Sequence, residues 1–424
     1  MKRVTIKEIF YLNAYWIGLS FMWNSLHVII LPAVLLHLVP DAHKNTYLGL
    51  LTFVGLIIAM LIQPISGSLS DRWVSRWGRR RPLIFLGTAF DFLFLAFLGW
   101  SGGLGWLALG YIGLQFSSNI AHGPAQGLLP DKVPPEQLGQ ASGFKNLMDM
   151  AGLVVSSLLI GRLLTPEVRH PVGVTGLVAA VLAAGAALTL LGTHEAPAHR
   201  GKPGSPRPSL LDSLRVDWHV HHTYGWLIAS RFFYLAGIYG IQTFAQYYVR
   251  DVLDVPNPIK LTGDLLAAIT LALIAFALAG GWLGDRFGHK RMSLAASLIG
   301  ALGCLLLLWA RTPTTLLIFG SVLGAGIGLF LTSNWALANE LAPAAEAGKF
   351  LGLTNLATAG AGAVGRLEGP LIDVFNNLHP GAWIGYIGLF LVGAISILAS
   401  AWLLRRISIR ELPAQSTGEQ TALG

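Results

Sequence analysis

The sequence predicts an all-α membrane protein with twelve transmembrane helices in two pseudo-symmetric six-helix bundles. Three observations predict this fold class. Of the 424 residues, 54% are hydrophobic, only 12% are charged and 50 are glycine, which an ordinary water-exposed protein does not show. Twelve apolar stretches are long enough to cross a bilayer, and one basic loop occurs twice. Lipid is therefore the expected solvent for most of the chain.

The twelve apolar stretches follow one another with short polar connections. A helix needs about 20 apolar residues to cross the hydrocarbon core. The stretches cover about 9–38, 47–69, 83–101, 105–129, 142–164, 173–192, 224–249, 263–283, 292–310, 314–338, 350–372 and 383–404. A polar, proline-rich break divides them six and six. We expect bundles at 1–192 and 223–410, a cytoplasmic linker at 193–222 and a cytoplasmic tail at 411–424.

The distribution of lysine and arginine predicts the orientation, because cytoplasmic loops retain positive charge. With the N-terminus inside, the inner segments hold 20 of the 29 basic residues, the outer loops hold 5, and the spans hold the other 4. We therefore expect a multi-pass protein of the cell membrane with both termini in the cytoplasm. The net charge of +8 then reflects topology, and no nucleic-acid partner is expected. The first stretch is longer than a signal-peptide core, so it should remain as the first helix.

The basic loop is part of an internal repeat. Its first copy runs from Gly67 to Pro82 and its second from Gly281 to Arg291. Other residues repeat at similar offsets: Asp71 with Asp285, Asn119 with Asn334, Asp131 with Glu340, Gly139 with Gly348, Gly143 with Gly352, and Asn146 with Asn355. In transporters built from repeats, the solute site lies between the repeats near the middle of the membrane.

Twelve spans in two halves, with a Gly-x-x-x-Asp-Arg-x-Gly-type loop after spans 2 and 8, resemble the major facilitator superfamily over nearly the whole chain. The run from Ser70 to Pro82, the Leu129-Pro130-Asp131 motif and the Gly139 to Gly143 segment resemble, more narrowly, the sucrose–proton symporters and the related glycoside-pentoside-hexuronide cation symporters. The resemblance implies two rocking halves and a central cavity lined by spans 1, 4, 7 and 10. No acidic residue occurs from Tyr47 to Ser70, so a sodium site of the melibiose type is not expected there.

The duplicated loop is predicted to control a gate. Glycine lets backbones approach closely, and aspartate accepts hydrogen bonds from arginine or from a helix N-terminus. Such contacts would latch the cytoplasmic side in one state; the alternative is that the arginines only set the topology. The expected gating residues are Gly67, Asp71, Arg72, Gly78 and Arg79 in the first copy, and Asp285, Arg286 and Gly288 in the second.

Polar residues at helical spacing predict the solute site, because polar side chains are costly in lipid and normally face a cavity or another helix. Gln115, Asn119, His122 and Gln126 form one stripe on span 4. The expected binding residues are Asn24, His27, Gln115, Asn119, His122, Arg231, Tyr234, Gln242, Trp335 and Asn339. The alternative is that these side chains only join helices through hydrogen bonds.

The residue types in this set favour a small neutral polar solute, such as a sugar or glycoside. Amides offer donors and acceptors together, and Trp or Tyr rings cover the apolar face of a sugar. Arg231 is the main fixed charge in the set. A lipophilic drug would be expected in a cavity richer in Phe and Met, although the same aromatic residues also suit it.

Proton coupling requires a group that changes its protonation state during transport. Asp91, Asp149 and Glu368 are the carboxylates within spans. Lys145 lies four residues before Asp149, so the two are positioned to pair. We rank Asp91 and Asp149 equally and Glu368 behind them. His27 also titrates near neutral pH in principle, as does His122.

Nothing in the sequence indicates catalysis. It has no phosphate-binding loop, nucleophile elbow or His-Glu-x-x-His metal site, and its single cysteine excludes an intramolecular disulfide. We predict a secondary active transporter without a cofactor, not an enzyme, that moves its solute with protons by alternating access as a monomer in the lipid bilayer. The alternatives are an exporter of amphipathic compounds and a non-transporting membrane assembly factor of the same fold.

Overall fold

The computed structural model describes residues 3–195, 221–343 and 346–407, and within these ranges all regular structure is helical. Only the two ends of the expected linker at 193–222 fall within the described residues, and the expected tail at 411–424 lies outside them.

The first half contains six spans. The first is one continuous rod made of α1 (Ile6–Asn24), the π-helical turn η1 (Ser25–Ile30) and α2 (Leu31–Leu35). A short 3₁₀ turn, η2 (Asp41–His43), leads into the second span. The remaining spans are α3 (Lys44–Arg72), α4 (Arg81–Gly99), α5 (Leu104–Lys132), α6 (Leu138–Leu163) and α7 (Val172–Gly192), with the 3₁₀ turn η3 (Pro135–Gln137) before α6.

The second half repeats this pattern with one break. Its helices are α9 (His222–Leu253), α10 (Pro258–Phe287), α11 (His289–Leu307), α12 (Pro313–Leu341), α13 (Ala347–Arg366), α14 (Gly369–Leu378) and α15 (Ile384–Arg405). The eleventh span, expected as one helix at 350–372, is therefore two helices. Pro370 lies in the first turn of α14, where its missing N–H costs nothing, whereas inside a continuous helix its ring would clash with the preceding turn.

In the described part of the chain, nine of the spans are long enough and apolar enough, by length and composition alone, to cross a membrane. The other three are α5, α9 and the α13–α14 pair, which carry polar residues in their interiors. Polar positions inside a span face a cavity or another helix. The polar residues of the three less apolar spans are therefore expected to face a cavity or a neighbouring helix.

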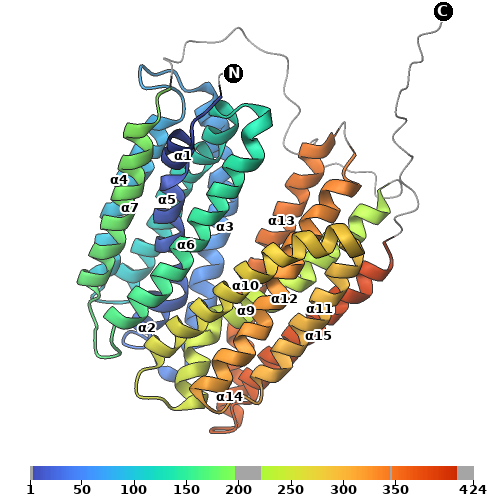
Figure 1. The fold of residues 1–424 in the computed structure, drawn as a ribbon. Coiled ribbons are helices and arrows are strands. Elements are labelled where there is room, and N and C mark those ends of the chain that lie inside the picture. Colours follow the sequence, from blue (N-terminus) through green and yellow to red (C-terminus); the bar gives the residue numbers. More distant parts are fainter. Residues whose placement is uncertain (1–2, 196–220, 344–345, 408–424) are drawn as a thin grey trace, which may run out of the picture.

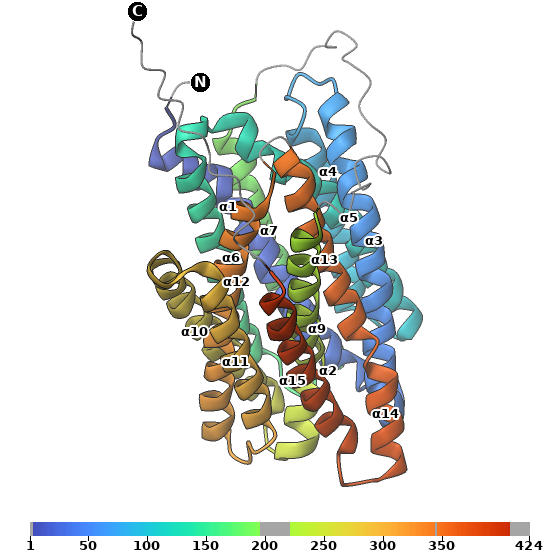
Figure 2. The ribbon, with the colours of Figure 1, turned by 90° about the vertical axis from the view of Figure 1, so that its right-hand side faces the viewer.

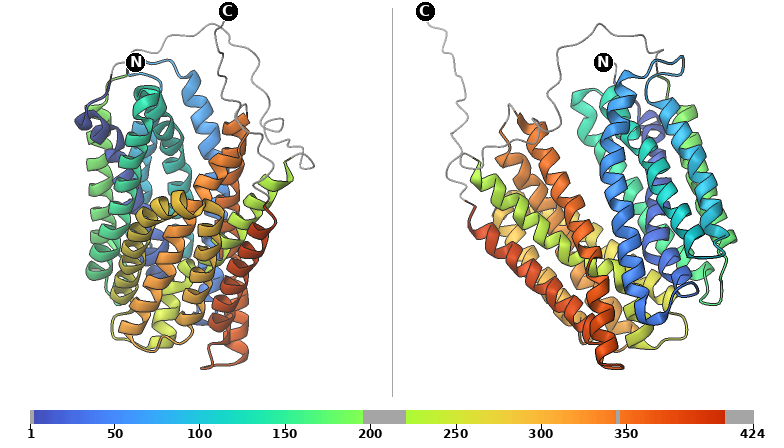
Figure 3. Two further views of the ribbon diagram at one scale, coloured as in Figure 1. Left: turned by 45° about the vertical axis from the view of Figure 1, so that its right-hand side comes forward. Right: turned by 180° about the vertical axis from the view of Figure 1, so that it is seen from behind.

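The two halves form separate bundles that meet at one end (Figure 1). We call the end where α1 begins and α15 ends the terminal face, and the end that carries η2 and the end of α14 the closed face. The bundles lie against each other near the closed face and diverge toward the terminal face, as the right-hand view of Figure 3 shows. Figure 2 looks onto the second half, with α10, α11 and α15 toward the viewer.

Glycines bring the halves together at two crossings, α6 with α10 and α3 with α13 and α14. A Cβ atom on Gly263 of α10 would lie 2.3 Å from the Ser157 carbonyl oxygen and 3.2 Å from the Gly161 Cα atom of α6. At the other crossing, a Cβ on Gly49 would lie 2.3 Å from the Arg366 carbonyl oxygen. Only glycine allows these close approaches between the two halves.

Candidate functional site

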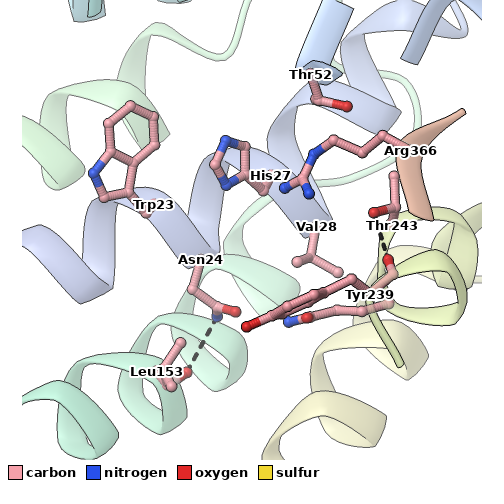
Figure 4. Close-up of a pocket in the computed structure, with 10 residues that line it drawn as sticks. Trp23, Asn24, His27, Val28, Thr52, Leu153, Tyr239, Thr243 and Arg366 are labelled. Carbon is pink, nitrogen blue, oxygen red and sulfur yellow. Dashed lines mark hydrogen bonds between the residues drawn. The ribbon is translucent and has the colours of Figure 1, made fainter. Parts of the chain in front are cut away.

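A cavity of about 190 Å³ lies between the two halves. Figure 4 shows its lining side chains, which come from the end of α1, η1, α3, α6, α9 and the end of α13. The lining residues are Trp23, Asn24, His27, Val28, Thr52, Leu153, Tyr239, Gln242, Thr243 and Arg366. We call this cavity the polar chamber, because most of these side chains carry hydrogen-bonding groups.

A second cavity of about 250 Å³ extends from the polar chamber into the second half. Its lining is dominated by leucine, isoleucine and other apolar side chains of α9, α10 and α12, including Leu266. Asn24, Leu153, Tyr239 and Gln242 line both cavities. We call the second cavity the apolar chamber. The shared lining residues place the polar and the apolar chamber next to each other.

The π-helical turn η1 positions His27 at the polar chamber. Such turns are rare and are often found at functional sites. The His27 Nε2 atom lies 2.9 Å from the Tyr111 hydroxyl, and the imidazole stacks on the Trp23 indole with ring centroids 5.1 Å apart. Gln115 donates from Nε2 to the same hydroxyl at 2.7 Å, and Asn119 donates to the Gln115 carbonyl at 2.7 Å. The predicted stripe on span 4 therefore begins directly behind His27.

The remaining residues of that stripe lie nearer the terminal face. His122 contacts the Trp16 ring edge-on at 5.1 Å between ring centroids. The exposed Gln126 side chain places Nε2 3.2 Å from Nε2 of His122. The stripe is thus continuous along α5, but Gln115, Asn119 and His122 line neither chamber; the stripe meets the polar chamber only through the contacts of Gln115 and Tyr111 with His27.

Arg231 is held on α9 by uncharged partners. Its Nη1 donates to Asn334 Oδ1 at 3.0 Å, and its Nε donates to the Thr358 hydroxyl at 2.9 Å. The guanidinium also lies 5.5 Å from the centre of the Trp335 ring. Asn339 is exposed one turn further along α12, where its amide donates to the Trp335 carbonyl at 2.9 Å. These predicted residues form a group on the terminal side of the chambers.

Tyr234 does not have its expected position at the cavity. Its ring is fully buried, stacks on Phe330 with centroids 3.6 Å apart, and points toward Gly300 of α11. The residues of α9 that line the polar chamber are instead Tyr239, Gln242 and Thr243. The few polar positions on α9 predict the cavity-facing side of the helix only to within about one residue. Tyr234 lies just outside the side that faces the cavity and packs against Phe330 instead.

Arg366 is the main site residue that sequence reasoning missed. The structure places its guanidinium in the polar chamber, while Glu368 follows the end of α13 and contacts Gly240 of α9. The sequence did contain a signal for Arg366: it is a basic residue within a span, and no aspartate or glutamate lies three or four residues away from it.

The three candidate proton carriers lie in different surroundings. Asp91 is fully buried in the first half, where Ser117 donates to its Oδ1 at 2.5 Å. Glu368 is partly buried, and its Oε2 has no hydrogen-bond partner among the described residues. Neither side chain lines a chamber.

Asp149 forms the expected pair with Lys145, whose Nζ lies 2.9 Å from Oδ2 of Asp149. Ser20 of α1 donates to the other carboxylate oxygen at 2.7 Å. The Lys145 ammonium lies 3.8 Å from the centre of the Trp16 ring. Asp149 is one helical turn from Leu153, which lines both chambers. Of the three carboxylates it is therefore the one linked to the site through its own helix and through α1.

The first copy of the basic loop forms a network within the first half. Arg80 pairs with Asp71 at 2.6 Å and with Asp131 at 2.9 Å, and Arg79 pairs with Asp131 at 2.5 Å. The hydrogen bond to Asp131 raises the pKa of the Arg79 guanidinium, so it stays charged. Gly78 makes the turn with φ of 92°, which other residues rarely adopt.

Two further first-copy residues have simpler positions. Gly67 faces Gly123 of α5, and a Cβ on Gly123 would lie 2.7 Å from the Gly67 backbone nitrogen, so this pair does allow a close approach. Arg72 is exposed at the end of α3.

The second copy is built similarly, with a histidine at its centre. His289 Nε2 lies 3.6 Å from Asp285 and 3.2 Å from Glu340. Arg286 lies over the Trp282 and Phe287 rings, and Gly288 has φ of 91°. The repeat predicted from the sequence is thus visible as two similar loops at the terminal face. The ion pairs named above lie within one half each. That the loops latch the cytoplasmic side stays a prediction, for an arrangement in which the terminal face is closed.

A network that sequence reasoning did not anticipate joins the halves at the closed face. Buried Lys44 pairs with buried Asp251 at 2.7 Å, and Arg250 pairs with Asp41 at 2.5 Å. Asp373 of α14 accepts three hydrogen bonds from the start of α3, as described below. Several hydrogen bonds and ion pairs join the two halves at this face, in contacts 32–247, 41–250, 42–377, 44–251, 45–373, 45–386, 46–373 and 162–264.

Comparison with known proteins gives a consistent picture. A family model described as Major Facilitator Superfamily matches residues 14–365 and 257–423. The multi-drug resistance efflux pump PmrA of Streptococcus pneumoniae is 24% identical over 77% of this chain and 79% of its own length. The sucrose transport protein SUT1 of Oryza sativa is 35% identical, but over only 18% of each chain. The crystal structure of the nucleoside transporter NupG superposes with a TM-score of 0.74 at 14% identity, covering 94% of this chain and 99% of that one.

Proposed function

The chain belongs to the Major Facilitator Superfamily of transporters, and we propose that it moves an amphipathic organic solute across the membrane by alternating access. The observation that carries this proposal is the junction of the two chambers. A solute lying across Asn24 and Gln242 would place a polar head among the side chains of one chamber and an apolar part among those of the other. Ligand sites of this kind combine a mostly apolar lining with a few placed polar groups.

The proposed orientation follows from the basic residues. Because loops that carry most lysine and arginine stay in the cytoplasm, the terminal face is assigned to the cytoplasm of the cell membrane. The structure then corresponds to a state sealed toward the outside, in which the solute exchanges with the cytoplasm. The opposite state requires the closed-face network to open and the terminal-face loops to approach each other.

A sugar or glycoside moved together with protons is the second candidate. The observation that favours it is the aromatic surface of Trp23 beside the amides of Asn24 and Gln242, which suits a sugar ring. A glycoside with an apolar aglycone satisfies both candidates. The relative PmrA is named a multi-drug resistance efflux pump, which supports a solute class wider than sugars.

Asp149 is the proposed proton carrier. Protonation of its carboxylate would weaken the bond to Lys145 and so change the contact between α6 and α1. We expect Asp149→Asn to lose solute accumulation driven by a pH gradient but to retain exchange of labelled for unlabelled solute, because exchange needs no net proton movement. Loss of both activities, with folding intact, would assign Asp149 a structural role instead.

The two-chamber site is tested by binding of phenylbutyl glucoside, which has a polar head and an apolar tail. We expect Trp23→Ala, in the polar chamber, and Leu266→Trp, which fills the apolar chamber, each to lower affinity at least about tenfold. Leu302→Trp is the matched control, because Leu302 is 50% exposed on the outer surface. If Leu266→Trp binds the glucoside as well as the wild type does, the apolar chamber is not part of the site.

A further inference from the structure

We propose that the solute carries a single negative charge and that Arg366 binds it in the polar chamber. This inference rests on the proposed function, because it specifies the charge of the same amphipathic solute. It starts from the surroundings of one guanidinium group.

Arg366 is the last residue of α13, immediately before the break in the eleventh span. Figure 4 shows its guanidinium reaching into the chamber toward His27. One nitrogen, Nη1, donates to the Gly362 carbonyl of its own helix at 2.6 Å. Its Nε is buried and has no hydrogen-bond partner within the described ranges. The guanidinium thus retains donors that point away from its own helix.

No carboxylate neutralises this charge in the part of the chain that the structure describes. Neither chamber has an aspartate or glutamate in its lining, and Arg366 has no acidic group within ion-pair distance. A charge taken out of water without a partner costs several kcal/mol, so buried charges are normally paired. The unpaired guanidinium therefore suggests that its counter-charge comes from a ligand.

A second guanidinium, that of Arg231, lies between the chambers and the terminal face. Its hydrogen-bond partners, Asn334 and Thr358, are uncharged. Lys145 of that region is paired with Asp149. Among the described residues, two guanidinium groups without carboxylate partners thus lie in and beside the chamber, and they favour an anion over a cation there.

The other groups in the chamber limit the anion to one charge. Thr52 donates its hydroxyl to the Leu48 carbonyl, and Thr243 donates to the Tyr239 carbonyl, so both offer only acceptors to a ligand. A single guanidinium balances a monoanion and binds a carboxylate with two parallel hydrogen bonds. A dianion would leave one charge uncompensated. A carboxylate on an apolar body is therefore the solute that fits both chambers.

Three ligands with one skeleton test the inference: phenylbutyrate, phenylbutanol and phenylbutylamine. Affinity is measured by thermal shift and by calorimetry on the full-length purified protein. We expect phenylbutyrate to bind about ten- to hundredfold more tightly than phenylbutanol, the factor that a charge-assisted hydrogen bond supplies. In Arg366→Gln this preference should disappear, and in Arg366→Lys it should be reduced, because lysine keeps the charge but not the two-pronged geometry. Arg311→Gln, in an exposed loop, is the control and should keep it.

The outcomes separate the inference from the proposed function. Binding of the alcohol as tightly as the acid, or an unchanged preference in Arg366→Gln, would overturn the anion inference and leave the amphipathic class in place. Tightest binding of the amine would overturn it as well. Binding of none of the three would reject the two-chamber solute class, and the anion inference with it. Because Arg366→Lys retains the buried charge, it also gives a result if Arg366→Gln does not fold.

Discussion

Asp373 holds the closed face together, and its replacement by asparagine should open that face. This carboxylate belongs to α14, is 4% exposed and packs against the start of α3. It accepts hydrogen bonds from the Asn45 backbone at 3.3 Å, from Asn45 Nδ2 at 2.8 Å and from the Thr46 backbone at 2.6 Å. Both backbone groups belong to the first turn of α3, whose N–H groups have no partner within the helix.

The magnitude follows from the groups that Asp373→Asn changes. An asparagine oxygen can still accept from Asn45, but its NH₂ would face the Thr46 N–H, a second donor. The loss of one charge-assisted bond costs about 1.5 to 3 kcal/mol, and the loss of the favourable interaction with the helix N-terminus costs about 0.3 to 1 kcal/mol more. Together these amount to about 2 to 4 kcal/mol, which shifts the equilibrium between the closed and open arrangements roughly 30- to 1000-fold.

The shift is measured as a distance between spin labels on the two halves. Labels at Arg169→Cys and Arg311→Cys, in exposed loops of the closed face, report its opening in a Cys304→Ser background. Asp373→Asn should add a population with longer distances. Asp254→Asn is the control, because Asp254 is exposed and adopts a left-handed conformation that asparagine also tolerates. An unchanged distance distribution in Asp373→Asn would refute the reasoning.

Three further predictions concern the crossing, the loop and the chamber. Gly263→Leu should separate α10 from α6 and lower the melting temperature by several degrees. Gly388→Leu is the control, because an added Cβ there would meet nothing within 4 Å. Equal melting temperatures of the two variants would show that the α6–α10 contact does not depend on glycine. Gly288→Ala, where an added Cβ would meet nothing within 4 Å, should destabilise the protein by about 1 to 2 kcal/mol because Gly288 has a φ of 91°; denaturation is compared with Gly102→Ala, and equal stabilities would remove the argument from strain. Tyr111→Phe removes the hydroxyl that is hydrogen-bonded to His27, so it should lower the affinity for phenylbutyl glucoside about five- to tenfold. An unchanged affinity by calorimetry would show that the Tyr111 hydroxyl does not position His27 for binding.

The fold was predictable because hydropathy and the repeat are properties of single segments. The bounds of most spans differ from the predicted stretches by only a few residues, since the apolar run of each helix ends where polar loops begin. The break before α14 could have been read from Pro370, but the apolar pattern continues across it. The lesson is that hydropathy predicts spans better than it predicts the continuity of their helices.

The site was predictable only in part, because it depends on helix rotation and on contacts distant in sequence. Of the ten predicted binding residues, Asn24, His27 and Gln242 line the polar chamber, whereas Arg366 was missed. The other seven line neither chamber: Gln115, Asn119, His122, Arg231, Tyr234, Trp335 and Asn339. Nothing in the local sequence of α14 indicates that its carboxylate meets the first turn of α3, more than three hundred residues earlier. Contacts of that kind follow from the packing of the two halves.

The most direct test of the central claim is transport of amphipathic solutes by the purified protein in liposomes with an imposed pH gradient. The two labelled solutes are phenylbutyl glucoside and phenylbutane sulfonate, which share an apolar tail and differ in the charge of the head. The account predicts that at least one of them accumulates faster than in protein-free vesicles, and that Leu266→Trp abolishes this accumulation. Equal entry of both solutes into vesicles with and without protein would contradict it and would favour a non-transporting membrane assembly factor.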